Sequence, residues 1–354
     1  MNAAPAPLGV GVIGCGTIAR YQHLPNLRRL RRARLAAVAD PDGAAREWAG
    51  RRYGVPAFAT AEELLAQPAV QAVVIATPTH LHAELAVRAA ETGKPFFLEK
   101  PIAASGEEAA RLLAAAGEAG VVAHVGYNLR FQPLYLRARE LLRSGLLGEV
   151  LAVRALFAEP LADVVAASWR ARRESGGGVF LDLAAHHFDL VRWLLADELV
   201  RVESAVTDVE GRSATARLST AGGVEVHVVS LYGAGPIDRV ELVGRRATLT
   251  LDRHVARLDA VGPRRRRYGA RRLRVAPSPA LVALRLRRLL QPSWEPSFAR
   301  ALGAFVDAAL GRPSAAGAPL PATLGDGAAS LAAVLAAELA ARRGVPTPVE
   351  PILA

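Results

Sequence analysis

The feature that most constrains the fold of this chain is an apolar run, Leu8 to Ile13, that ends in Gly14-Cys15-Gly16-Thr17-Ile18-Ala19. A helical pattern follows the turn through about Leu30. In such a strand, turn and helix, the first glycine permits a tight bend, the second lets the backbone approach a pyrophosphate, and the small third residue lets the helix pack closely on the strand. The pattern predicts a dinucleotide-binding domain whose helix N-terminus faces the phosphates. The expected contacts of this turn with the cofactor are Gly14, Gly16, Thr17 and Ile18.

The end of the second strand indicates which cofactor binds. The strand runs from Arg34 to Ala39 and is followed by Asp40. A carboxylate at this place accepts hydrogen bonds from the hydroxyls of the adenosine ribose. Pro41 and Asp42 come next, so no basic residue is at hand for a 2′-phosphate, and NAD(H) is favoured over NADP(H). The alternative is that Asp40 only forms the strand-end turn of Asp-Pro-Asp.

A further parallel strand is predicted at Val70 to Ala76, because this run is almost entirely apolar, and the next strands are predicted at Lys94 to Leu98 and Val121 to Val125. Strand ends in such a sheet face the cofactor crevice. Thr77, Pro78, His80 and His82 are therefore expected near the nicotinamide. His80 and His82 could equally cap or pack the helix that begins here.

Length and composition set the broad class. A chain of 354 residues usually forms two domains. Met1 to Pro7 do not resemble a signal peptide, and no run reaches the roughly 20 apolar residues of a membrane span. The lone Cys15 fits a reducing compartment, so we predict a cytoplasmic protein with no transmembrane segment. The net charge of +11 is interpreted as compositional bias, since no basic segment is interleaved with aromatics. We expect no nucleic-acid partner and no metal site.

Two later segments complete a recognisable set. Glu99-Lys100-Pro101 follows the strand that ends at Leu98, and a glycine run opens the segment Gly176 to His186. With the glycine turn and the segment Thr77 to His82, these resemble the Gfo/Idh/MocA oxidoreductase family in order and spacing, over nearly the whole chain. The resemblance implies an α/β protein. A Rossmann domain, 1–126, would precede an α+β domain, 127–354, with an open, mostly antiparallel sheet. Homodimers or homotetramers are implied, and the C-terminal helices could pack back on the first domain.

The resemblance also implies an activity. Members mostly transfer hydride between a nicotinamide cofactor and a secondary alcohol or ketone of a sugar, nucleotide sugar, amino sugar or cyclitol. By this analogy Lys100 lies beside the nicotinamide, Lys100-Pro101 could be a cis peptide, and Asp182 and His186 supply the remaining catalytic groups. Two alternatives stay open, namely a redox-neutral glycoside cleavage or epimerisation, and a non-catalytic NAD(H) sensor.

The chemistry asks for these residue types independently. Hydride can leave a carbinol carbon only if the hydroxyl proton also leaves, so a base such as His186 is needed. Lys100 as a cation would stabilise the developing alkoxide. Asp182 lies four residues before His186, hence on the same helix face, and would orient the substrate or the imidazole. Alternatively, Glu99-Lys100 is a surface ion pair, and Asp182 and His186 form an ordinary helix pair. His187 is expected to be structural.

Other side chains are weaker candidates. Asn128 and Arg130, after the last Rossmann strand, could contact the cofactor carboxamide or the substrate, or Arg130 could form an interdomain salt bridge. Trp169 and Arg170 lie in an expected loop, Glu159 to Glu174, that either borders the substrate or is a solvated loop. The expected cofactor contacts beyond the glycine turn are Asp40, Thr77, Pro78, His82, Glu99, Lys100 and Asn128. The expected substrate contacts are Lys100, Arg130, Trp169, Arg170, Asp182 and His186.

The second half is predicted to form an antiparallel sheet. Strands are expected at 150–157, 201–209, 214–220, 224–231 and 239–243, and helices at 296–310 and 325–343. The arginine cluster Arg264 to Arg267 and the basic amphipathic stretch Leu281 to Leu290 depart from the family pattern. They are interpreted as a solvated insertion or, alternatively, as a surface for anionic membranes or phosphorylated ligands.

Overall fold

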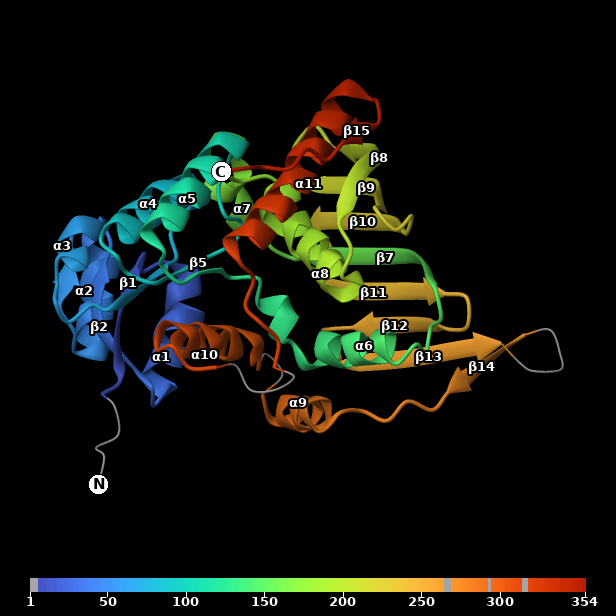
Figure 1. Cartoon of the computed structure of the whole chain (residues 1–354), viewed down its shortest axis with the longest axis horizontal. Coiled ribbons are helices and arrows are strands. Elements are labelled where there is room, and N and C mark those ends of the chain that lie inside the picture. Colours follow the sequence, from blue (N-terminus) through green and yellow to red (C-terminus); the bar gives the residue numbers. More distant parts are fainter. Residues whose placement is uncertain (1–5, 264–268, 292–293, 314–317) are drawn as a thin grey trace. The chain divides into compact units, whose positions relative to one another are not determined.

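The computed structural model describes residues 6–263, 269–291, 294–313 and 318–354. The chain forms two compact units (Figure 1). The first comprises Met1–Asn128, Ser297–Ala328 and Ile352–Ala354, and the second comprises Leu129–Pro296 and Ala329–Pro351. The first crossing between the units lies two residues after the predicted boundary at 126. Residues 297–328 belong to the first unit, whereas the predicted second domain ran from 127 to 354 with the C-terminal helices allowed to pack back on the first.

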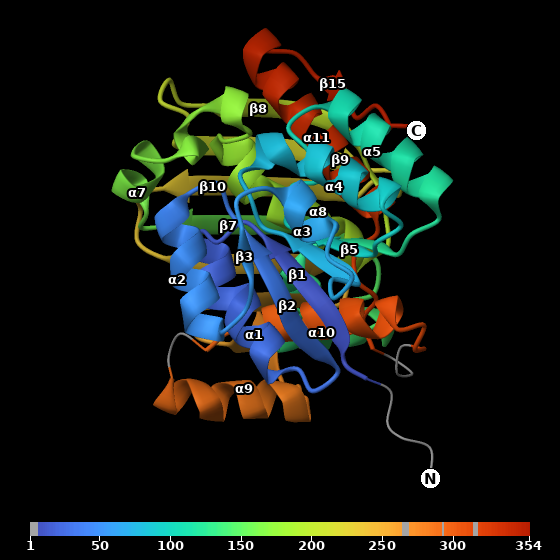
Figure 2. The same ribbon diagram turned by 90° about the vertical axis from the view of Figure 1, so that its left-hand side faces the viewer.

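The first unit is built on a six-stranded parallel sheet with the order β3-β2-β1-β4-β5-β6, in which β1 and β2 lie side by side (Figure 2). Its central strands are buried on both faces, as the continuous apolar runs predicted. This order is that of a Rossmann fold, whose ligands bind beyond the carboxyl ends of the strands. The strands are β1 (Leu8–Ile13), β2 (Ala33–Ala39), β3 (Ala57–Phe58), β4 (Ala72–Ile75), β5 (Phe96–Leu98) and β6 (Ala123–Val125).

The helix after the glycine turn is not a regular α-helix. Residues Ala19–His23 form a π-helical segment, and α1 (Leu24–Arg29) continues from it. The amide of Leu24 donates to the carbonyl oxygen of Ala19, five residues earlier. Pro25, at the second position of α1, has no N–H to offer the preceding turn, and this explains the local change of hydrogen-bond register. The other helices of this unit are α2 (Gly43–Tyr53), α3 (Ala61–Leu65), α4 (His82–Glu91), α5 (Gly106–Ala119) and α10 (Ser297–Ala309).

The second unit is built on a nine-stranded sheet with the order β14-β13-β12-β11-β7-β10-β9-β8-β15 (Figure 1). All neighbours are antiparallel except β7 and β10. Along β9 and β10 every second residue is buried, so one face belongs to the core and the other is open. The strands are β7 (Val150–Glu159), β8 (Leu199–Thr207), β9 (Ser213–Thr220), β10 (Glu225–Tyr232), β11 (Ile237–Gly244), β12 (Thr248–Asp252), β13 (Arg257–Pro263), β14 (Ala270–Leu273) and β15 (Thr347–Pro348).

The helices of the second unit include α6 (Pro133–Arg143), α7 (Ala162–Ala166), α8 (Ala185–Leu195) and α9 (Pro279–Leu290). A π-helical segment, Phe180–Ala184, leads directly into α8. The long helix α11 (Leu324–Arg343) begins in the first unit and ends in the second. Within the described part of the chain, α11 is the one helix long and apolar enough to cross a membrane, and its apolar stretch is 61% buried inside the protein, as in a core helix.

Most predicted elements are confirmed, and the differences are local. The expected strands of both halves and the helices at 296–310 and 325–343 are present within a few residues. The expected loop Glu159 to Glu174 is wrong in detail, because α7 and two short 3₁₀ turns, Trp169–Ala171 and Arg173–Ser175, form there. The basic stretch at 281–290 is helix α9, whereas the cluster Arg264 to Arg267 lies outside the described residues.

Candidate active site

The glycine turn after β1 has the backbone that its sequence predicted. Gly14 has φ +95°, and a Cβ there would lie 2.5 Å from the carbonyl oxygen of Ala76, so only glycine fits. A Cβ on Gly16 would meet no atom within 4 Å, and Gly16 and Thr17 are exposed. Ala19 is fully buried. The turn thus brings an open stretch of backbone to the start of a helix, which is the environment that a pyrophosphate requires.

Asp40, at the end of β2, is bound to the glycine turn. One carboxylate oxygen accepts from the amide of Cys15 at 2.6 Å, and the other accepts from the amide of Asp42 at 2.8 Å. Asp42 in turn caps α2 by accepting from Ala44 and Ala45. The turn-forming alternative for Asp40 is therefore observed. It does not compete with ribose binding, because each carboxylate oxygen has a second lone pair.

The loop after β4 is held by a buried histidine. The ring nitrogens of His82 lie 2.7 Å from the carbonyl oxygen of Pro101 and 2.9 Å from that of Thr77. Burial lowers the pKa of His82, and a neutral imidazole carries one N–H, so it donates to one carbonyl at a time. His82 opens α4 and joins the loop at Thr77 to the loop at Pro101. The packing alternative for His82 is therefore what the structure shows.

The segment Glu99-Lys100-Pro101 is held in place by the buried side chain of Glu99. Lys100-Pro101 is a cis peptide bond. Glu99 is buried, and its carboxylate accepts from the amide of Lys100 at 3.2 Å and lies 2.7 Å from Nε2 of His23. Because Glu99 points inward to His23, the surface ion-pair alternative is wrong for Glu99. Lys100 itself is half-buried at the carboxyl end of the strand β5.

His23 was not among the predicted site residues. It ends the π-helical segment, is 1% exposed, and packs its ring against Phe97 and Phe298. A histidine in an amphipathic helix gives no sequence signal of a partner 76 residues away. The pair shows how the first helix and the Glu99-Lys100 segment are tied together.

Asn128 is buried and its side-chain amide donates to Ser297 Oγ of α10 at 2.8 Å. Arg130, assigned to the second unit, forms a buried bidentate ion pair with Asp189 of α8, with Nε and Nη2 at 2.8 and 2.5 Å from the carboxylate. The salt-bridge alternative for Arg130 is therefore observed, but the bridge joins two elements of one unit. A bidentate guanidinium and carboxylate hold each other in one geometry, so Arg130 fixes the position of α8.

The glycine run brings two backbone segments of the second unit into close contact. A Cβ on Gly177 would lie 2.2 Å from the carbonyl oxygen of Arg170, so this position admits only glycine. The same carbonyl accepts from the amide of Gly178 at 2.8 Å. The run therefore places the turn at Trp169 and Arg170 directly against the π-helical segment that carries Asp182.

Asp182 is buried among polar side chains. Its carboxylate accepts from the hydroxyl of Tyr232, at the end of β10, at 2.5 Å, and Arg170 Nε lies 3.6 Å away. Burial and the charge of Asp182 raise the pKa of Tyr232 well above its usual range, so the phenol stays protonated and donates. Glu159, opposite Tyr232 on β7, also has a raised pKa because it is desolvated. Sequence reasoning missed Tyr232, whose only signal was its place at a strand end before Gly233.

His186 and His187 have opposite environments. Every residue from Val179 to Leu194 is buried except His186, which is half-buried. His187 is fully buried, and its Nε2 lies 3.2 Å from Oδ1 of Asp238. His187 is thus structural, as predicted, and the accessible imidazole of the pair belongs to His186.

Asp238 organises the core beneath these histidines. Its carboxylate accepts from Tyr135 at 2.8 Å and from Arg253 at 2.5 Å as well as contacting His187. Burial raises the pKa of Asp238, but the charge of Arg253 and the hydrogen bond with His187 outweigh burial and hold that pKa far below its usual range. The residue that carries the accessible imidazole therefore sits on a helix fixed by buried charges.

Comparison with known proteins now decides the family. A model of the oxidoreductase family with an NAD-binding Rossmann fold, GFO/IDH/MocA, matches residues 8–127, and the model of a GFO/IDH/MocA C-terminal domain matches residues 135–250. A Bacillus subtilis (strain 168) protein named scyllo-inositol 2-dehydrogenase (NAD(+)) is 30% identical over 284 aligned residues, and the match covers 73% of this chain and 77% of the relative. The chain belongs to the Gfo/Idh/MocA oxidoreductase family.

Solved structures of this fold agree. The WlbA dehydrogenase from Bordetella pertussis, solved in complex with NADH and UDP-GlcNAcA, superposes with a TM-score of 0.82 at 22% identity, covering 98% of this chain and 99% of that one. A putative NADPH-dependent oxidoreductase from Desulfitobacterium hafniense has the same TM-score at 20% identity, with the same coverage. The fold is a Rossmann domain with a C-terminal mixed-sheet domain, as the sequence predicted.

As a Gfo/Idh/MocA member the protein is an enzyme, an NAD(P)-dependent oxidoreductase that acts on CH–OH groups. The first unit offers a cradle that fits a dinucleotide, since Gly16 exposes backbone at a helix start and Asp40 stands at the next strand end. The second unit offers the half-buried imidazole of His186 four residues after the buried carboxylate of Asp182. Among the described residues, no group of three or more His, Cys, Asp or Glu side chains could hold a metal ion.

Proposed function

We propose that this enzyme transfers hydride between NAD(H) and a secondary alcohol or ketone of a sugar, nucleotide sugar, amino sugar or cyclitol. The observation that carries the proposal is the half-buried His186, a titratable group in an otherwise buried stretch of helix. A base that accepts a hydroxyl proton must be reachable by substrate yet partly shielded from water. The cyclitol and nucleotide-sugar classes are supported by the relatives' names alone.

Gly14, Gly16, Thr17, Ile18, Asp40, Thr77, Pro78, Glu99, Lys100 and Asn128 would hold the cofactor, which when bound accepts or gives the hydride. The backbone at Gly16 and the following helix start would bind its phosphates, and Asp40 its ribose hydroxyls. His82 contributes through the two loops that it joins. We propose NAD(H) as the preferred form because a carboxylate held by Cys15 and Asp42 would repel a 2′-phosphate.

The enzyme's own groups divide the proton chemistry. We propose that His186 takes the hydroxyl proton during oxidation and returns it during reduction. Lys100, whose backbone is anchored by Glu99, stabilises the alkoxide as a cation. Asp182 accepts a hydrogen bond from Tyr232 and would orient the substrate, with Trp169 and Arg170 beside it. Arg130 acts indirectly, by fixing α8.

The deciding experiment follows the absorbance of reduced nicotinamide with NAD or NADP and a panel of inositols, aldoses, amino sugars and nucleotide sugars. Lys100→Met and His186→Gln should each lower kcat by about 100-fold or more. Lys94→Met is the matched control, because Lys94 and Lys100 are the two lysines of the chain and Lys94 donates to the carbonyl oxygen of Val70. Full activity in both variants would reject the proposed roles.

Two other outcomes would redirect the proposal. Tightly retained cofactor with product formed but no net reduced nicotinamide would assign a redox-neutral cleavage or epimerisation. Binding of NAD(H) without turnover of any panel member would favour a sensor. We further propose that the protein is cytoplasmic and forms homo-oligomers through the open sheet face of the second unit. Light scattering of the purified chain would test the oligomeric state.

A further inference from the structure

Nearly all of the net charge of the chain comes from one segment, residues 257–290. Its sequence contains eleven arginines and a single acidic residue, Asp259, so it accounts for +10 of the formal net charge of +11. The rest of the chain is close to neutral. The charge excess is therefore local, and compositional bias does not explain it.

The helix in this segment, α9, places arginines as well as leucines against the protein, and Leu281 and Leu284 are buried there. Arg285 Nε donates to the carbonyl oxygen of Ala256 at 2.8 Å, and Arg288 donates to those of Arg253 and His254 at 2.5 and 3.1 Å. Two of its arginines thus face the protein. A surface helix normally keeps its charged side chains in water.

Three of the five leucines of α9 face the solvent. Leu286 is 61% exposed, Leu289 79% and Leu290 86%, and Val282 is also exposed. Val282, Leu286 and Leu289 follow one another at spacings of four and three residues, so they form one stripe along the helix. We call Val282, Leu286, Leu289 and Leu290 the α9 stripe. Contiguous exposed apolar side chains of this kind mark a binding surface.

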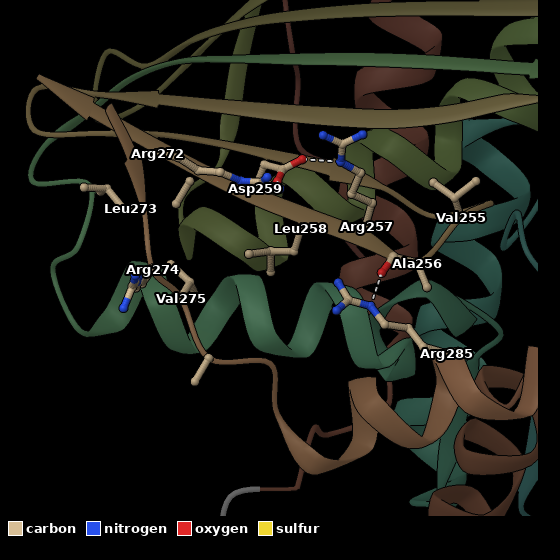
Figure 3. A pocket seen from close by; sticks show the side chains of 12 residues that line it. Val255, Ala256, Arg257, Leu258, Asp259, Arg272, Leu273, Arg274, Val275 and Arg285 are labelled. Carbon is tan, nitrogen blue, oxygen red and sulfur yellow. Dashed lines mark hydrogen bonds and ion pairs between the residues drawn. The ribbon is translucent and has the colours of Figure 1, made fainter. Parts of the chain in front are cut away.

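A basic pocket of about 1090 Å³ adjoins α9 (Figure 3). Arg257, Arg272, Arg274 and Arg285 line it, with Leu258 and Leu273 between them. Asp259 is the single acidic residue of the lining and is already paired with both Arg257 and Arg272. Arg274 is exposed and makes no hydrogen bond or ion pair with any described residue. The pocket therefore has guanidinium groups in excess of its carboxylate, which suits a phosphate.

We propose that the α9 stripe and the arginines beside it bind the surface of a lipid bilayer rich in anionic headgroups. At about 100° per residue, Leu289 lies about 40° around the helix from Arg285, so the stripe borders the pocket. The leucines would enter the boundary between headgroups and acyl chains, and the arginines would pair with lipid phosphates. This inference needs neither substrate nor cofactor, so it stands independently of the proposed function.

Charge decides against the other occupants. A second copy docked by a two-fold axis would bring the same basic patch against itself, and like charges would repel. A nucleic acid would match the charge but would leave the leucines unexplained, and the residues that line the pocket include no aromatic side chain on which a base could stack. An anionic bilayer matches both the arginines and the leucines.

The test is flotation of the full chain with vesicles of phosphatidylcholine, with and without phosphatidylglycerol, at low and high salt. The protein should float with the anionic vesicles at low salt and remain behind with neutral vesicles. Leu286→Gln/Leu289→Gln should weaken binding about ten-fold or more while keeping a helix-forming side chain at both places. Arg274→Gln should weaken binding by a smaller factor and reduce its salt dependence.

Matched controls remove the same chemistry elsewhere. Val345→Gln, just after α11, where the side chain is 51% exposed, and Arg51→Gln on α2 should leave flotation unchanged. Unaltered circular dichroism and melting would show that each variant folds. Failure of the native chain to float, or equal flotation of the leucine variant, would overturn the proposal. Two further results would overturn the proposal. One is an oligomer that is smaller in the leucine variant than in the native chain. The other is duplex DNA that binds the native and leucine-variant chains equally and displaces both from vesicles.

Discussion

The two units hold their buried polar groups in different ways. In the first unit the groups near the predicted cofactor site mostly bind backbone, as when His82 reaches two carbonyl oxygens and Asp40 accepts from two amides. In the second unit charged side chains pair with each other, as in Arg130 with Asp189 and Arg253 with Asp238. The pair of His23 and Glu99 is an exception within the first unit.

The difference teaches how each half of the site is positioned. Backbone groups at strand ends are fixed by the sheet itself, so a side chain that binds them is placed by topology. A pair of buried charges depends on both partners, and loss of one leaves the other desolvated and unpaired. The second unit should therefore be the more sensitive of the two to single substitutions at its buried charges.

Asp238→Asn should have the largest effect on stability. The variant leaves Arg253 buried beside an uncharged amide, with the more distant carboxylate of Glu295 at 3.5 Å, and breaking a buried pair in this way costs about 3–5 kcal/mol. The free energy of unfolding by denaturant would measure it. Asp252→Asn, which disturbs the more exposed pair with Arg239, should cost less than about 1 kcal/mol. Equal losses in the two variants would abolish the contrast between buried and exposed charges.

Mild acid should act on the first unit before the second. Burial lowers the pKa of His124 from 6.5 to about 4, so this histidine stabilises the fold above pH 6.5 and its contribution is lost as pH falls toward 4. The loss amounts to about 3 kcal/mol over that window. The pKa of Asp238 is also depressed, so its contribution is lost only below the ordinary aspartate value of 3.8.

His124→Phe checks the acid prediction, since an aromatic ring is kept against Phe305 while the titration is removed. Its unfolding free energy should vary less between pH 6.5 and 4 than that of the native chain. His227→Phe, at an exposed position on β10, is the control and should keep the native slope. An unchanged slope in His124→Phe would show that other groups dominate the acid response.

His23→Leu should remove the buried side-chain pair of His23 and Glu99 in the first unit. The buried carboxylate of Glu99 would lose its side-chain partner, at a cost of about 1–3 kcal/mol, and the anchoring of Lys100 should loosen. We expect kcat to fall more than the KM for substrate rises. His23→Gln keeps a donor and should recover part of both losses. If Leu and Gln variants behave alike, the hydrogen bond has no positioning role.

Tyr232→Phe should have the smallest effect of the four. It removes the hydroxyl that donates to Asp182 without changing the shape of the ring, and kcat/KM should fall about ten-fold, which corresponds to about 1.4 kcal/mol. The pH dependence of kcat/KM should shift because the carboxylate loses a donor that stabilises its charge. A variant with a native pH profile would place Tyr232 outside the site chemistry.

The sequence predicted the parts of the molecule that depend on local pattern. The glycine turn, the parallel strands and the family followed from Gly14, Gly16 and the segment at Lys100, because a backbone conformation that only one residue type can adopt is visible in the sequence. His23 and Tyr232 could not be predicted, since each interacts with a partner that is distant in sequence. Arg130 was predicted as a ligand contact with a salt bridge as the alternative, and only the fold reveals Asp189 beside it.

The chain passes between the two units four times, at Asn128, Pro296, Ala328 and Pro351. Phe305 of α10, nearly three hundred positions from β1, completes the core around Phe97 and His124. On the ribosome, domains generally fold from the N-terminus as they emerge. Here the nucleotide-binding unit begins first and finishes late, because α10, which completes its core, is synthesised only after nearly all of the other unit. A fragment ending at residue 128 would expose that unfinished core, so during synthesis this enzyme depends on its last helices to protect its first ones.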